Sequence, residues 1–129
     1  MIYLDSSAIV KLVVAEPGSA ALSSYVEEHE EHVSSALARV EVMRALRRAD
    51  QSELTIQRAE RVLSSIALVR IDEPLLIGAA AQEPRELRSL DAIHLATALS
   101  IDGVDVLVTY DPRLSAAAVE VGLAVAVPT

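Results

Sequence analysis

The sequence predicts an α/β fold, a three-layer α/β/α sandwich in which helices cover both faces of a parallel sheet of four or five strands. Short apolar segments alternate with helical segments along the whole chain. The apolar segments are continuously hydrophobic, which is typical of parallel strands buried on both faces. The chain contains no Phe and no Trp. Its core must therefore be packed from small aliphatic side chains, which suits helices layered on a sheet.

A length of 129 residues corresponds to one ordinary domain, and we expect a single domain over residues 1–129. Hydrophobic residues make up 52% and charged residues 23%, which allows a sizeable core and argues against disorder. Cysteine is absent, which excludes disulfides, thiolate metal sites and a cysteine nucleophile. We find no leader segment and no apolar run of about 20 residues, so we expect a cytoplasmic protein that does not enter a membrane.

Strands are predicted where short apolar runs are closed by turn or capping residues. The first run covers residues 2–4 and ends at Asp5, followed by two serines that can begin a helix. Residues 106–109 form a run rich in β-branched side chains, which favours a strand. The other expected strands cover residues 32–34, 68–71 and 123–127.

Helices are predicted between these strands, with an additional one in the middle of the chain. Ser35, Ser52 and Ser89 can cap helices, and Pro112 takes the favoured first helical position. The expected helices cover residues 8–15, 19–31, 36–49, 53–66, 74–82, 90–101 and 112–121.

Acidic side chains follow two of the predicted strands. Asp5 comes directly after the first strand, and Asp111 comes two residues after the strand over 106–109. The carboxyl ends of parallel strands meet at one sheet edge, where open α/β sheets bind ligands. Asp91 lies in the first turn of a helix that begins at this edge if it runs antiparallel to the strands. Glu41 lies among apolar neighbours in the third helix, and these four acids form the candidate site.

Each of these acids also has a purely structural interpretation. Asp5 and Asp111 can cap the helices that follow them, and Asp91 can favour a helix dipole. Glu41 can pair with Arg44, three residues further along the same helix. The four acids together nevertheless favour a functional site, because the topology brings three of them to one edge.

A cluster of carboxylates has a definite chemistry. Two unit charges about 4 Å apart repel by about 4 kcal/mol at an effective dielectric constant near 20, so clustered acids protonate or bind cations. Oxygen ligands without cysteine select Mg²⁺ or Mn²⁺. Such an ion can polarise a phosphate and lower the pKa of a bound water. The acids therefore indicate phosphate-ester hydrolysis, although they do not by themselves specify RNA.

Four segments, in order, resemble the motifs of PIN domains. Residues 1–8, with Lys11 and the Glu-Pro-Gly sequence at 16–18, are similar to the opening of the VapC toxin branch. Residues 40–46, 90–98 and 108–114 are similar to the second, third and fourth motifs. The resemblance covers essentially the whole chain, and four motifs in the family's order are a specific signal.

This resemblance implies an endoribonuclease that depends on Mg²⁺ or Mn²⁺ and acts as the toxin of a type II toxin–antitoxin pair. A metal-activated water would hydrolyse the RNA phosphodiester bond. Asp5 and Asp91 would be the principal metal ligands, and Glu41 and Asp111 would complete the pocket. The family also implies a homodimer and a small VapB-type antitoxin, whose basic tail covers the acidic site.

Two hydroxyl positions of the family are also matched. By the resemblance, Ser6 and Thr109 would orient Asp5 and Asp111 through hydrogen bonds, with a helix cap and a strand-end hydroxyl as the structural alternatives. The sequence departs mildly from the family, because Ser6 replaces a more usual Thr and Tyr110 and a proline surround the last acid. The role of Asp111 is therefore less well defined than that of Asp5.

The net charge of −8 disfavours strong non-specific binding of nucleic acid. Bound cations would offset part of this charge, and local arginines could hold RNA. Arg44, Arg85 and Arg88 are the candidates, with a solvated charged surface as the alternative. Tyr110 could stack on a base, although we favour a half-buried packing role for it.

The three histidines are not assigned to the site. His29 and His32 lie in an acidic segment that we interpret as a solvated helix end and turn. His94 follows Asp91 by three residues and could face the site, but we interpret it as a packed helix residue.

Other functions remain as alternatives. A response-regulator receiver fits the size and acidity, and Asp72 could be its phosphorylated residue, but the only lysine is Lys11. A haloacid-dehalogenase-type phosphatase needs a second aspartate at position 7, which is serine. A degenerate, non-catalytic nuclease domain kept for protein binding is the remaining alternative.

Overall fold

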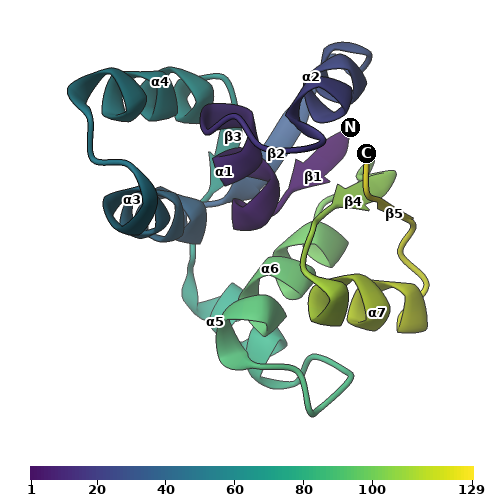
Figure 1. The fold of residues 1–129 in the computed structure, drawn as a ribbon. Helices are drawn as coiled ribbons and strands as arrows, with labels where there is room; N and C mark the ends of the chain where they lie inside the picture. The colour runs from purple at the N-terminus through teal and green to yellow at the C-terminus, as the bar shows by residue number, and fades with distance from the viewer.

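A five-stranded parallel sheet forms the centre of the computed structural model, which describes all residues from 1 to 129. The strand order is β3-β2-β1-β4-β5 (Figure 1). The strands are β1 (Ile2–Leu4), β2 (His32–Ser35), β3 (Ala67–Val69), β4 (Val106–Val108) and β5 (Val125–Ala126). The predicted α/β class with a parallel sheet is confirmed.

The order of the strands explains why helices cover both faces. The chain leaves β1 toward one edge through β2 and β3, and it then returns to the other side of β1 with β4 and β5. Crossover connections between parallel strands are right-handed, so reversing the direction of travel moves the helices to the opposite face. The carboxyl ends of β1 and β4 flank this reversal, which is where open α/β sheets bind ligands.

The first four helices cover one face of the sheet (Figure 1). They are α1 (Ser6–Val13), α2 (Ser19–Glu27), α3 (Leu37–Ala49) and α4 (Glu53–Ser64). Ile9, Val42 and Leu63 from three of these helices are buried with Leu4 and Val108 of the sheet. The buried members of this cluster are all aliphatic, whereas the cluster on the opposite face also contains the fully buried Tyr3.

The last three helices cover the opposite face. They are α5 (Glu73–Ala80), α6 (Ser89–Ser100) and α7 (Pro112–Glu120). Leu95 of α6 and Leu114 of α7 pack on Tyr3 and Leu107 of the sheet, and α5 packs outside against α6. None of the helices combines the length and the hydropathy that a membrane-spanning helix needs.

Several predicted boundaries differ from the structure. The second helix ends at Glu27 rather than at residue 31, and His29 and His32 hydrogen-bond backbone carbonyls at its end. The prediction that Ser89 caps α6 is wrong, because Arg88 occupies the N-cap position without a side-chain hydrogen bond. The prediction that Ser35 caps α3 is also wrong, because Ala36 occupies the N-cap position and Ser35 is the last residue of β2. The Ser35 hydroxyl still accepts a hydrogen bond from the Leu37 amide.

Candidate active site

Asp5 is held rigidly at the carboxyl end of β1. Its Oδ1 accepts hydrogen bonds from the Ser7 hydroxyl at 2.6 Å and the Ala8 amide at 3.0 Å, so it caps α1. Its Oδ2 accepts a hydrogen bond from the Thr109 hydroxyl at 2.6 Å. Asp5 is only 4% exposed, and burial raises the pKa of its carboxyl despite these three donors. A buried carboxylate with a raised pKa gains from a nearby cation.

Thr109 connects Asp5 to Asp111. Parallel pairing places Leu4 beside Val108, so the residues after β1 and β4 emerge next to each other. The Thr109 Oγ1 that donates to Asp5 also accepts a hydrogen bond from the Asp111 amide at 3.1 Å. Asp111 in turn caps α7. One hydroxyl thus fixes the ends of two neighbouring strands.

Glu41 reaches the same edge from α3. Its Oε1 accepts hydrogen bonds from the Ser6 hydroxyl and from Nε2 of His94, both at 2.6 Å. Burial acts to raise the pKa of Glu41, but the hydrogen bonds from His94 and Ser6 outweigh it and lower the pKa. Both bonds are made to Oε1, which leaves Oε2 available to a ligand.

His94 links Glu41 to the core. It is 3% exposed, and its Nδ1 lies 2.8 Å from the Tyr3 hydroxyl. Burial raises the pKa of Tyr3, so the phenol keeps its proton and donates to Nδ1. Because ionised Glu41 can only accept, Nε2 carries the hydrogen that points to it. The chain Tyr3–His94–Glu41 therefore has one consistent direction of donation.

Asp91 has a carboxylate oxygen that lacks a hydrogen-bond partner. It lies in the first turn of α6, and its Oδ2 is buried without a hydrogen-bond partner. Arg88 Nε is 3.7 Å from this oxygen, which is an ion pair but not a hydrogen bond. Burial raises the pKa of Asp91, and the charges of Asp111 and Glu41 raise it further. Buried polar atoms in proteins normally have partners, so this oxygen is suited to a ligand.

The structure brings the four predicted acids to one edge of the sheet. Some of their purely structural roles are also present. Asp5 and Asp111 are both helix caps. The alternative pairing of Glu41 with Arg44 does not form, since Glu41 bonds to Ser6 and His94 instead. No three acidic or imidazole groups lie close enough together to make a ready-formed metal site. The four acids therefore share one edge of the sheet without forming a closed set of metal ligands.

The predicted roles of the two supporting hydroxyls are corrected. Ser6 donates to Glu41 and not to Asp5, because the first turn of α1 directs it toward α3. Thr109 orients Asp5 with its hydroxyl and binds only the backbone amide of Asp111. Ser7, to which we assigned no site role, is the serine that holds Asp5.

His94 is packed in the core, as we expected of this helix histidine, and it also contacts the site. Its position three residues after Asp91 was the available signal, because residues three apart share a helix face. The partners Glu41 and Tyr3 lie far away in the sequence, so no local pattern could identify them.

The candidate RNA contacts differ in their surroundings. Tyr110 is a packing residue: its hydroxyl donates to the Pro128 carbonyl at 2.6 Å, and Lys11 Nζ lies 4.6 Å from the centre of its ring. These contacts do not support the base-stacking role. Arg85 is highly exposed and pairs only with Glu86 at 3.7 Å. Arg44 borders a small hollow on α3 lined by two further arginines.

The receiver alternative fails on geometry. Asp72 follows the edge strand β3 and caps α5 by accepting a hydrogen bond from the Leu75 amide at 3.0 Å. It is separated from β1 by the whole of β2, so it is not part of the acidic cluster.

Comparison with known proteins agrees with this geometry. The sequence matches the PIN domain family over residues 2–120. It is 52% identical over 130 residues to ribonuclease VapC46 of Mycobacterium tuberculosis, covering 99% of this chain and 98% of that protein. It is 42% identical over 133 residues to ribonuclease VapC35 of the same organism, covering 99% and 97% of the two chains.

Solved structures share the fold. A toxin–antitoxin complex from Klebsiella pneumoniae contains a chain that superposes with a TM-score of 0.75 at 20% identity, covering 100% of this chain and 98% of that one. VapC20 of Mycobacterium tuberculosis, a sarcin–ricin loop cleaving toxin, superposes with a TM-score of 0.74 at 18% identity, covering 91% and 95% of the two chains.

Proposed function

The chain belongs to the PIN-domain family and, within it, to the VapC ribonuclease toxins of toxin–antitoxin systems, and we propose that it is an endoribonuclease dependent on Mg²⁺ or Mn²⁺. Asp5 and Asp91 would be the principal ligands of the ion, with Glu41 and Asp111 completing the site. The observation that carries this proposal is the state of Asp91 Oδ2. This oxygen is buried without any hydrogen-bond partner, and Asp91 lies close enough to Asp111 and Glu41 for their charges to raise its pKa.

The residues present suit a hard divalent cation. The acids offer oxygen donors, and the imidazole nitrogen nearest to them, Nε2 of His94, is committed to Glu41. Burial and neighbouring negative charge raise the pKa of Asp91, and a cation would relieve both effects. When bound, Mg²⁺ or Mn²⁺ would supply an activated water and charge stabilisation at the phosphate.

The surrounding side chains prepare the acids for this role. Ser7 and Thr109 fix both oxygens of Asp5, so its carboxylate cannot turn away from the sheet edge. Ser6 and His94 keep Glu41 ionised and oriented. Because these side chains are already in place, they need little rearrangement when negative charge develops on the reacting phosphate.

RNA would be held by arginines rather than by the overall charge of the protein. Arg88 lies beside Asp91 and is 65% exposed, so it can turn toward a phosphate. Arg44 lies one turn beyond Glu41 on α3 and makes no ion pair in the structure. Guanidinium groups bind phosphates in a bidentate manner. Arg85, exposed and further from the acids in sequence, would contribute less.

Two protein partners follow from the proposal. A small VapB-type antitoxin with a basic tail would neutralise the acidic cluster, and the structurally similar Klebsiella chain comes from a toxin–antitoxin complex. A homodimer is supported by exposed apolar side chains on α5 and α6, including Leu76, Ile77 and Leu99. Co-purification with the product of an adjacent small gene and light scattering test these two partners.

Cleavage of a defined RNA tests the proposed function. We expect activity with Mg²⁺ or Mn²⁺, none with EDTA, and a loss of at least about 100-fold in Asp5→Ala. Asp102→Asn is the matched control, since Asp102 lies beyond the opposite end of α6. Activity that survives both EDTA and Asp5→Ala would reject the proposal.

A further inference from the structure

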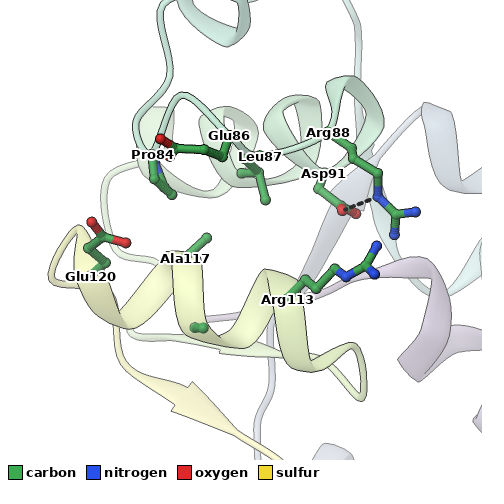
Figure 2. Close-up of a pocket in the computed structure, with 9 residues that line it drawn as sticks. Pro84, Glu86, Leu87, Arg88, Asp91, Arg113, Ala117 and Glu120 are labelled. Atoms are coloured by element: carbon green, nitrogen blue, oxygen red, sulfur yellow. Dashed lines mark ion pairs between the residues drawn. The ribbon is translucent and has the colours of Figure 1, made fainter.

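A pocket of about 350 Å³ opens directly beside Asp91 (Figure 2). It lies between α7 and the segment that precedes α6, and we name it the α7 pocket. Asp91, Arg88 and Arg113 lie at one end, and Glu120 lies at the other (Figure 2). The first end carries both arginines beside Asp91 and is part of the proposed active site, whereas the second end is acidic.

We propose that the α7 pocket binds the base of the nucleotide next to the scissile phosphate and selects guanine. This inference rests on the proposed function, because it makes the pocket a subsite of the same RNA substrate. It adds a base preference and names the residues that impose it.

The arginine end fits a phosphate. Figure 2 shows the side chains of Arg88 and Arg113 directed to the same end of the pocket as Asp91. Arg88 is paired with Asp91 at 3.7 Å, and Arg113 makes no ion pair in the structure. A phosphate bound between the two guanidinium groups would lie beside the acidic cluster. The nucleotide attached to it would extend along α7.

The middle of the pocket is apolar and suits the face of a flat ring. Ala116 and Ala117 form the α7 side, and Leu87 faces Ala117 across the gap (Figure 2). Ala117 is almost completely buried, so the face of a planar ligand would pack mainly against Leu87 and the exposed Ala116. Arg113 and Glu120 are seven residues apart on one face of α7, a rise of about 10 Å. That span is on the scale of a single nucleotide.

The acidic end selects among bases. Glu120 and Glu86 line this end, and ionised carboxylates can only accept hydrogen bonds. Glu120 makes no ion pair, and the pairing of Glu86 with Arg85 at 3.7 Å is highly exposed and therefore weak. Guanine presents two adjacent donors, N1–H and the 2-amino group, to a single carboxylate. The pairing edges of adenine, cytosine and uracil place acceptors next to their donors, which the carboxylate would repel.

Cleavage of a random-sequence RNA pool tests the inference. We expect the wild-type protein to enrich guanine about tenfold or more at one position flanking the cut. Inosine, which lacks the 2-amino group, should lower cleavage at that position by a similar factor. Glu120→Gln should lose the preference because cleavage at guanine sites falls toward that at the other bases, whereas Glu60→Gln on α4 should retain the wild-type profile. A wild-type profile without guanine, or the same profile in Glu120→Gln, would overturn the inference.

A binding measurement keeps the inference testable even if the proposed function fails. Guanosine monophosphate, titrated in EDTA and followed by amide NMR shifts, should perturb α7 more strongly than adenosine monophosphate does. Ala116→Phe, at an exposed position of the pocket wall, should abolish this response. Equal responses to the two nucleotides would contradict the inference. The pocket could instead be an antitoxin-binding surface. If Ala116→Phe weakened antitoxin binding but left nucleotide binding and RNA cleavage unchanged, the inference would be overturned.

Discussion

His94 Nε2 lies 2.6 Å from Glu41 Oε1, although the two residues are 53 positions apart. The imidazole is buried, and its other nitrogen is fixed by the Tyr3 hydroxyl at 2.8 Å. The contact thus joins a core strand, α6 and α3 at the acidic edge. We infer that His94 is a positioning residue for Glu41, because it holds the carboxylate through Oε1 and leaves Oε2 to face a ligand.

Replacement of His94 tests this positioning role. His94→Leu removes the donor to Glu41 and should lower kcat by about tenfold or more, with a smaller change in KM. His94→Gln can place an amide donor near the position of Nε2 and should recover part of the lost kcat. If both variants lose the same activity and the same stability, the role of His94 is packing alone.

Thr109 supplies a second test of pre-organisation. Thr109→Val removes the donor to Asp5 and the acceptor for the Asp111 amide. Leaving these buried groups unpaired should lower the free energy of unfolding by about 1–3 kcal/mol and reduce cleavage. Thr109→Ser retains the hydroxyl and is the matched control. Equal stability of the Val and Ser variants in chemical denaturation would show that the bridge is not needed.

The buried carboxyl of Asp5 predicts a pH dependence of stability in the metal-free protein. Its pKa is raised by burial, so the folded state holds this proton more tightly than the unfolded state. The wild type should therefore gain stability relative to Asp5→Asn as the pH falls from 7 through the raised folded pKa toward about 4. Denaturant unfolding at several pH values measures this. A stability difference that stays constant between pH 7 and pH 4 would contradict the raised pKa.

The arginines of α3 predict a salt effect on substrate binding. Arg44 and Arg48 lie three and seven residues after Glu41, on the same face of the helix. Arg44→Gln and Arg48→Gln should each raise KM and reduce the dependence of RNA affinity on log salt by roughly 0.7. Arg61→Gln on α4 is the control. Unchanged salt slopes in both α3 variants would mean that RNA does not follow this helix.

The sequence predicts those features of the fold and the site that depend on neighbouring residues in the chain. Continuous apolar runs predicted the parallel strands, and Asp5 and Asp111 were placed together because strand ends meet at one edge. The start of α6 differs from the prediction because Ser89 is its first helical residue and not its cap. The least predictable features depend on tertiary contacts. Ser7 rather than Ser6 holds Asp5, and the partners of His94 lie on other elements. A one-dimensional pattern carries no signal for such contacts.

Calorimetric titration of Mn²⁺ into the metal-free protein tests the central claim most directly, because it measures the acidic cluster without any assumption about the RNA. Asp91 is the residue to change, since its buried Oδ2 lacks a partner. We predict saturable binding to the wild type and to Asp102→Asn, and a loss of affinity of at least about tenfold in Asp91→Asn. Binding of the same affinity in Asp91→Asn, or no binding to the wild type, would contradict the assignment of a metal site to these carboxylates.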